Sequence, residues 1–381
     1  MKGDLALKAV GILLMLAALG FAVSKAPDRS LDSLVPRWAP PPSDFIELDS
    51  QLVHYRDQGP SSDPLPLVLI HGTGASLHTW EGWVTELSAT HRVISFDLPG
   101  FGLTGPNADG DYSDARYVAF VRQLLSRLGV GRAIVAGNSL GGEIAWQLAL
   151  ADPARVAGLV LIDAAGHAFE PEELPLGFRI ARMPVLREGM RWVLPRRAIE
   201  DSVMSVYGDP QRVSAALVDR YYELTLREGN RVALMQRMDQ LAPGPVERLP
   251  EIRVPTLILW GGKDRLIPPK WGEAFHVAIP GSRLVSFPSL GHVPQEEDPA
   301  ATLAALRDWL STVPSSKEYL GRDRAVASGR SASAGAGHPL GVLRPVSAPE
   351  GTAMLAGLTG KHIAIPGRLG SGPALGPQVA E

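Results

Sequence analysis

The chain has 381 residues, 45% of them hydrophobic, a formal net charge of −3 and no cysteine. This length suits two or three domains, or one large α/β domain with an insertion. The absence of cysteine excludes disulfides, thiolate metal sites and a cysteine nucleophile, so the chemistry must come from Ser, His, Asp, Glu or Lys. The slightly acidic balance lacks the basic footprint of polyanion binding, and nucleic acid is not an expected partner.

An uncharged apolar stretch covers residues 9–23, with Lys8 before it and Lys25 after it. Its length lies between that of a secretory signal core and that of a full membrane span. We therefore expect residues 1–25 to direct the chain to a membrane. Two outcomes stay open: an uncleaved anchor with an extracytoplasmic catalytic domain, or a cleaved signal of a secreted protein.

Two further segments flank the predicted folded part. Residues 26–44 are interpreted as a Pro-rich tether, because the prolines within residues 35–42 favour an extended, semi-rigid chain. Residues 314–381 are rich in Gly, Pro and Ala and show no periodicity, so they are predicted to be a disordered tail.

Between these segments, short apolar runs alternate with helical patterns. The apolar runs lack polar alternation, as strands covered on both faces by helices do, and they lie at residues 67–70, 92–96, 133–136, 156–162, 255–260 and 284–287. Helices are expected at residues 80–89, 115–128, 140–150 and 300–310. The alternation predicts a doubly wound, mostly parallel α/β sheet that binds its ligand at the carboxyl ends of the strands.

One interval departs from this alternation of strands and helices. Residues 164–251 contain no convincing strand but hold helical segments at 198–207 and 213–238. An insertion at the carboxyl end of a strand would lie over the ligand crevice, so a helical cap is predicted there. The core then has two parts, residues 45–163 and 252–313.

A nucleophile motif lies between a predicted strand and a predicted helix: Gly137-Asn138-Ser139-Leu140-Gly141. This is the Gly-x-Ser-x-Gly elbow in the strand–turn–helix context that it requires. The glycines are needed because the turn forces the serine into a strained backbone conformation in which a Cβ two residues before or after it would collide. Ser139 is therefore the candidate nucleophile, held at the N-terminus of a helix.

A serine hydroxyl needs a base to remove its proton. His292 follows the last predicted strand and precedes the last helix, which brings it to the sheet edge where Ser139 is expected. Asp264 follows the preceding strand and is assigned to orient His292. Asp163, which also ends a strand, is the rival for this role and is assigned instead to the base of the cap.

The tetrahedral intermediate needs two preorganised donors. One is expected to be the backbone NH of Leu140, directly after the nucleophile. The other is expected in the loop His71-Gly72-Thr73-Gly74, where we assign the NH of Thr73. His71 is interpreted as shaping this loop, not as the base. This chemistry requires neither a metal nor an organic cofactor.

Taken together, the motifs resemble the α/β-hydrolase superfamily in order and spacing, over roughly residues 45–313. They are His71-Gly72-Thr73-Gly74, Asp97-Leu98-Pro99-Gly100-Phe101-Gly102, Gly137-Asn138-Ser139-Leu140-Gly141-Gly142, Gly261-Gly262-Lys263-Asp264 and Gly291-His292. The resemblance implies the α/β-hydrolase fold, the triad and a helical cap.

The resemblance also bears on the reaction. A serine in the elbow argues against the dehalogenase and epoxide-hydrolase branches, whose nucleophile is a carboxylate. Asn138 is similar to the carbon–carbon bond hydrolases of aromatic ring cleavage, whereas the residues after His292, Val293-Pro294-Gln295-Glu296-Glu297, are more similar to those of esterases and lipases.

We therefore expect a serine hydrolase that cleaves carboxylic esters through an acyl-enzyme on Ser139. The expected partners are a small, apolar ester substrate and, through the N-terminal segment, a membrane. The alternatives are a carbon–carbon bond hydrolase of the aromatic meta-cleavage type, an acyltransferase and, from another class, a catalytically silent binding module.

Overall fold

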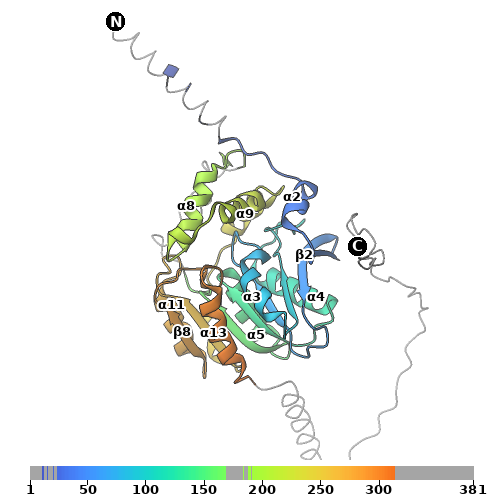
Figure 1. Ribbon diagram of the computed structural model, residues 1–381, viewed down its shortest axis with the longest axis vertical. Coiled ribbons are helices and arrows are strands. Elements are labelled where there is room, and N and C mark those ends of the chain that lie inside the picture. The colour runs from blue at the N-terminus through green and yellow to red at the C-terminus, as the bar shows by residue number, and fades with distance from the viewer. Residues whose placement is uncertain are drawn as a thin grey trace, which may run out of the picture.

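The computed structural model describes residues 24–168 and 191–313, together with positions 11, 12, 15, 20, 183, 188 and 189. Figure 1 shows a twisted sheet between layers of helices, with further helices gathered at one end of the domain. The sheet has eight strands in the order β1-β2-β4-β3-β5-β6-β7-β8.

The strands are mostly parallel, as the sequence predicted. Their bounds are β1 (Asp44–Leu48), β2 (Gln51–Gln58), β3 (Leu67–Ile70), β4 (Val93–Phe96), β5 (Ala133–Asn138), β6 (Val156–Ile162), β7 (Thr256–Gly261) and β8 (Arg283–Phe287). Strands β3 to β8 pair in parallel, while β1 pairs antiparallel with β2 and β2 antiparallel with β4. The antiparallel β1–β2 hairpin was not predicted.

Helices cover both faces of this sheet. They are α3 (Glu81–Leu87), α4 (Asp114–Arg127), α5 (Leu140–Ala151), α11 (Pro269–Ala278), α12 (Pro294–Glu297) and α13 (Pro299–Leu310). Strand β3 shows why its sequence is a continuous apolar run: Val68 and Ile70 belong to one core cluster, and Leu67 and Leu69 to the cluster on the opposite face. Burial on both faces leaves no position for a polar side chain.

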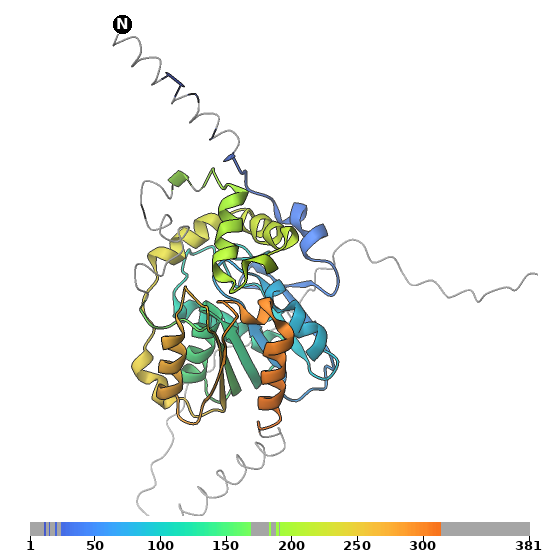
Figure 2. The ribbon, with the colours of Figure 1, turned by 60° about the vertical axis from the view of Figure 1, so that its left-hand side comes forward.

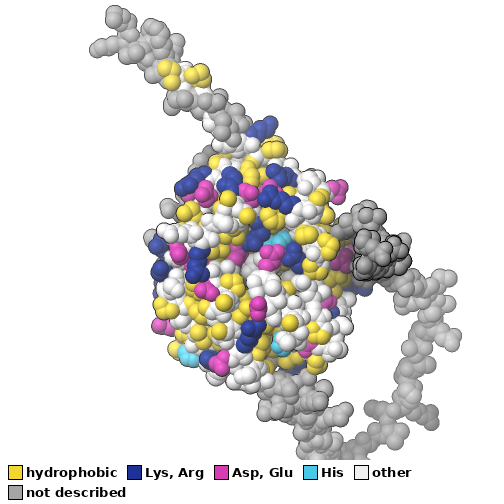
Figure 3. Space-filling view, viewed as in Figure 1, with side chains coloured by type: hydrophobic (Ala, Val, Ile, Leu, Met, Phe, Trp, Pro, Cys, Tyr) yellow, Lys and Arg dark blue, Asp and Glu magenta, His cyan; other side chains and the backbone are white. Residues whose placement is uncertain are grey.

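Three further helices, α8 (Arg196–Val206), α9 (Ala215–Thr225) and α10 (Asn230–Asp239), fall within the interval predicted to form the cap. The single helical segment predicted at residues 213–238 is two helices, because Gly229 adopts a left-handed conformation with φ 86° between them. Charges of both signs lie side by side on this end of the molecule (Figure 3). Arg196, for example, binds Asp219 at 2.7 Å.

The predicted extended tether is wrong at residues 31–38, which form helix α2 (Leu31–Trp38) despite the internal Pro36. Figure 1 shows α2 beside α9. Arg37 donates to Glu223 of α9 at 2.6 Å, and the indole NH of Trp38 donates to the same carboxylate at 2.7 Å. These tertiary contacts outweigh the low helix propensity of proline.

Most of the predicted membrane segment, residues 1–25, lies outside the described residues, as does the predicted tail at 314–381. None of the helices in the described part of the chain is long and apolar enough to cross a bilayer.

Candidate active site

Ser139 occupies a strained turn between β5 and α5. Its backbone φ is 55° and its ψ is −120°, a conformation that residues other than glycine rarely adopt. Three backbone hydrogen bonds hold it there. The NH of Ser139 donates to Ile162 O at 3.0 Å, and its carbonyl accepts the NH groups of Glu143 and Ala165, each at 3.0 Å.

The glycines of the elbow are required by close packing. A Cβ on Gly137 would lie 2.0 Å from the carbonyl oxygen of Gly141, and a Cβ on Gly141 would lie 2.1 Å from that of Ile70. Gly72, in the loop after β3, leaves only 3.0 Å between an added Cβ and the Cβ of Ser139. The elbow and this loop are therefore in direct contact.

His292 and Asp264 form a buried pair at the carboxyl edge of the sheet. Nδ1 of His292 lies 2.7 Å from Oδ2 of Asp264. The other oxygen, Oδ1, accepts the backbone NH groups of Leu266 at 2.8 Å and Ile267 at 3.0 Å. Since a carboxylate accepts, the pair assigns the ring proton to Nδ1 and leaves Nε2 as the basic nitrogen.

The loop that carries His292 is fixed by three groups from other elements. The NH of His292 donates to Val206 O at the end of α8 at 2.7 Å, and its carbonyl accepts Nδ2 of Asn138 at 2.9 Å. The NH of the preceding Gly291 donates to Glu297 at 2.8 Å. Sequence reasoning missed the positioning roles of Asn138 and Glu297, because neither is visible before the loops are brought together.

Of the two residues assigned to the oxyanion hole, Leu140 directly follows Ser139, and Thr73 follows Gly72, which packs against Ser139. Leu140 is the first residue of α5, so its NH is at the positive end of a 12-residue helix. Thr73 lines the same cavity as Ser139 and His292. His71 shapes the loop: Nδ1 bonds to Gly72 O at 2.8 Å and Nε2 accepts the NH of Leu98 at 2.9 Å.

Asp163 lies at the end of β6, in contact with the histidine–aspartate pair. Its Oδ1 accepts the NH of Gly261 at 2.9 Å. Burial, and then the nearby Asp264, raise the pKa of Asp163 well above its usual range. In the described part of the chain, Asp163, Asp264 and His292 are the one group of His, Asp and Glu placed closely enough to hold a metal ion. The direct His292–Asp264 hydrogen bond favours a proton-handling role for this group.

A cavity of about 270 Å³ lies between the elbow and the cap. Figure 2 shows the cap helices above the carboxyl ends of the strands. The cavity walls are mainly apolar, with Val193, Leu194, Ile199, Val203, Leu234, Met238, Leu241, Leu266 and Val293 among the lining residues. Among the described lining residues, Arg231 is the only lysine, arginine, aspartate or glutamate. Its Nη2 binds Asp28 at 2.5 Å.

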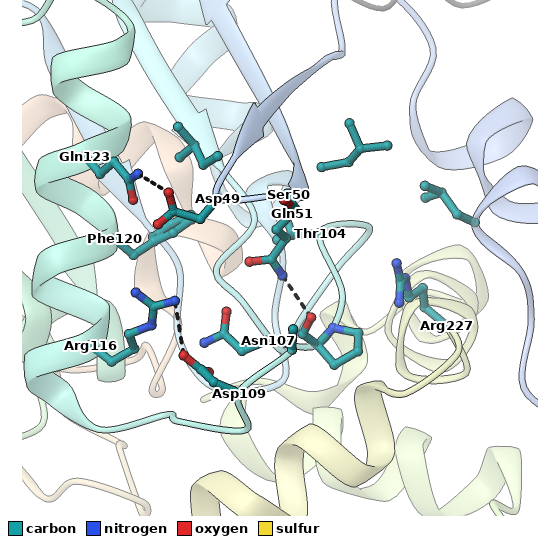
Figure 4. Close-up of a pocket in the computed structure, with 15 residues that line it drawn as sticks. Asp49, Ser50, Gln51, Thr104, Asn107, Asp109, Arg116, Phe120, Gln123 and Arg227 are labelled. Carbon is teal, nitrogen blue, oxygen red and sulfur yellow. Dashed lines mark hydrogen bonds and ion pairs between the residues drawn. The ribbon is translucent and has the colours of Figure 1, made fainter.

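A second, more polar cavity of about 550 Å³ lies between the β1–β2 turn and α4 (Figure 4). It shares no lining residue with the first. Its polar groups bind one another: Gln123 donates to Asp49 at 2.8 Å, and Arg116 pairs with Asp109 at 3.3 Å. The catalytic candidates all lie at the first cavity or directly beside it.

Comparison with known proteins matches residues 66–299 to the family model of the alpha/beta hydrolase fold. The 2-hydroxy-6-oxo-2,4-heptadienoate hydrolase of Pseudomonas putida is 30% identical over 260 residues, which are 65% of this chain and 89% of that protein. The dihydrolipoyllysine-residue acetyltransferase component of the acetoin cleaving system of Cupriavidus necator is 28% identical over 75% of this chain and 77% of its own length. Among solved structures, a bacterial membrane phospholipase A has a TM-score of 0.63 and 26% identity, covering 82% of this chain and 97% of its own.

Proposed function

Because the chain belongs to the alpha/beta-hydrolase family, we propose that it is a serine hydrolase whose nucleophile is Ser139. The observation that carries this proposal is the buried hydrogen bond between His292 and Asp264, beside a serine in a strained elbow at a cap-covered cavity. Backbone strain at non-glycine residues often occurs at functional positions. A catalytically silent module would not need the acid–base pair.

In the proposed mechanism, Oγ of Ser139 adds to a substrate carbonyl carbon while its proton passes to Nε2 of His292. Asp264 stabilises the resulting imidazolium, and the NH groups of Leu140 and Thr73 hold the oxyanion. Collapse of the intermediate breaks the bond to the leaving group, which takes up the proton from His292. Water then repeats the sequence at the acyl-enzyme and releases the acid.

For the bond that is cleaved, the curated relatives favour the carbon–carbon alternative over the ester hydrolysis predicted from the sequence. Two Pseudomonas putida relatives are a 2-hydroxy-6-oxononadienedioate/2-hydroxy-6-oxononatrienedioate hydrolase, 29% identical, and a 2-hydroxy-6-oxo-2,4-heptadienoate hydrolase, 30% identical. The chain covers 88% and 89% of their lengths. In carbon–carbon hydrolysis the electron pair of the broken bond stays on the leaving carbon, where the conjugated system of the substrate delocalises it. Such a substrate carries a carboxylate, whereas the cation that lines the cavity, Arg231, already binds Asp28.

Ester hydrolysis is the second candidate, and two observations favour it. The cavity walls are mainly apolar, and their aliphatic side chains suit an acyl chain. The membrane phospholipase A resembles 82% of the chain. In this case residues 1–25 would tether the enzyme to the membrane that holds its substrate, with the catalytic domain outside the cytoplasm or secreted after cleavage.

A substrate panel separates the candidates. The full-length protein and its Ser139→Ala variant are assayed with a 2-hydroxy-6-oxo dienoate, with p-nitrophenyl esters of increasing acyl length, and with an ester plus added alcohol. Serine-dependent turnover of the dienoate well above that of every ester supports carbon–carbon cleavage. Turnover of esters alone favours the second candidate, and a new ester product with alcohol identifies acyl transfer. Unchanged turnover in Ser139→Ala would refute the assignment of the nucleophile.

A further inference from the structure

A second carboxyl group lies against the proposed catalytic pair and has no role in the mechanism above. Asp163 is 0% exposed and Asp264 is 4% exposed. One oxygen of each and one ring nitrogen of His292 lie within 4.8 Å of one another. Asp163 also has φ 43°, in the left-handed region that is uncommon for residues other than glycine. The fold thus holds this carboxyl group in place against a local conformational preference.

The two carboxyl groups have different sets of donors. Asp264 accepts three hydrogen bonds, from the NH groups of Leu266 and Ile267 and from the His292 ring. Oδ1 of Asp163 accepts the NH of Gly261, whereas Oδ2 is buried without an N–H or O–H donor in the described part of the chain.

Two adjacent carboxyl groups shielded from water do not both ionise, because their charges repel at low dielectric. The group with more donors keeps the negative charge, and the other keeps the proton. By this comparison Asp264 is the carboxylate and Asp163 is the carboxylic acid. The direction of the pKa change at Asp163, upward through burial and through Asp264, agrees with this distribution of the proton.

We propose that Asp163 is a positioning residue, a carboxylic acid that keeps its proton at neutral pH and donates it in a hydrogen bond to Asp264. This inference rests on the triad of the proposed function. The donated hydrogen bond draws charge away from the Asp264 carboxylate, so that Asp264 attracts a proton on His292 less strongly. The neutral, basic form of His292 is thereby retained to lower pH.

Two other charged side chains lie near this cluster. Glu297 of α12 acts electrostatically on Asp163 and accepts the NH of Gly291, next to His292. Lys263 precedes Asp264, and its ammonium group donates to Gly208 O at 3.3 Å. The test leaves both side chains unchanged, so that only the Asp163 group differs between the variants.

The test measures the rate of fluorophosphonate labelling of Ser139 against pH, which needs no knowledge of the natural substrate. Asp163→Asn keeps a neutral donor of the same shape and should keep the midpoint of the acid limb. Asp163→Ala loses the donor and should move that midpoint upward by about half to one pH unit. A downward shift in Asp163→Asn would mean that a negative charge had been removed and would overturn the proposal, as would an unchanged midpoint in a folded Asp163→Ala.

Infrared difference spectra provide a second readout that does not depend on labelling or on the Ala variant. At neutral pH the wild-type protein should show the carbonyl stretch of a protonated carboxylic acid that Asp163→Asn lacks. Absence of this difference band would overturn the proposal. Glu143→Gln is the matched control, because burial raises the pKa of Glu143 to about 8 and so keeps it a carboxylic acid at neutral pH. This variant should remove a different acid band and leave the acid limb unchanged. A wild-type protein that shows the Asp163 band but takes up no label would refute the proposed function and leave the proton on Asp163 established.

Discussion

The elbow geometry predicts that one added methyl group at Gly141 disables the nucleophile. A Cβ there would lie 2.1 Å from Ile70 O and 2.7 Å from His71 O. Real Cβ atoms essentially never approach closer than about 3.0 Å, so the Ile70 carbonyl and the first turn of α5 must separate by roughly 0.9 Å. That movement displaces the NH of Leu140 and the side chain of Ser139 together.

A displacement of about 1 Å in a catalytic group costs on the order of 10²-fold in rate. Overpacking also costs about 1–3 kcal/mol of unfolding free energy, which would lower the melting temperature by roughly 2–10 °C in a domain of this size. Gly141→Ala should therefore label with fluorophosphonate about 100-fold more slowly and melt earlier.

The matched control is Gly131→Ala, in the exposed turn before β5, where an added Cβ meets nothing within 4 Å. This variant should keep the wild-type rate. Because alanine favours a helix over glycine by about 1 kcal/mol, a Gly141→Ala protein with a wild-type labelling rate and a raised melting temperature would refute the steric argument.

Two further predictions concern titratable groups. Asp264→Asn should lower kcat by about 10⁴-fold, because its NH₂ group donates to Nδ1 of His292 and so imposes the wrong tautomer on the ring. The melting temperature should change little, since the amide oxygen can still accept the NH groups of Leu266 and Ile267. A loss of kcat below tenfold would contradict the role assigned to Asp264. Burial, and then Asp114, raise the pKa of Glu143 to about 8 from about 4.5. The protonated Glu143 therefore adds its full contribution to the free energy of unfolding below pH 4.5. This contribution is lost as pH rises through 8, at up to ~1.4 kcal/mol per pH unit. In urea unfolding, the free energy of unfolding of Glu143→Gln relative to wild type should be more favourable at pH 8 than at pH 5. An equal difference between the two proteins at both pH values would contradict the raised pKa.

The sequence predicted the sheet well where strands are buried on both faces, because runs such as residues 67–70 and 156–162 cannot be anything but core. It did not predict the β1–β2 hairpin. Strand β2 carries His54 and Arg56, which are buried only because Asp97, Ser43 and Glu81 bind them from elsewhere in the fold. Such compensation is invisible until the partners are brought together.

Helix α2 and Asp163 illustrate the same limit. The internal Pro36 argued for an extended chain, yet Glu223 of α9 binds both Arg37 and Trp38 and holds the segment as a helix. Asp163 was placed correctly at a strand end, but its contact with Asp264 depends on the spatial order of β6 and β7. Motifs and strand ends identified the triad candidates, but the sequence does not show which other side chains lie against them in the fold.

The most direct test of the central claim is fluorophosphonate labelling of the full-length protein, followed by mapping of the modified residue. The assignment of Ser139 as the nucleophile predicts one label per chain, on Ser139, that is absent from Ser139→Ala and forms much more slowly in Asp264→Asn. Equal labelling of wild type and Ser139→Ala, or a folded wild-type protein that takes up no label, would contradict it.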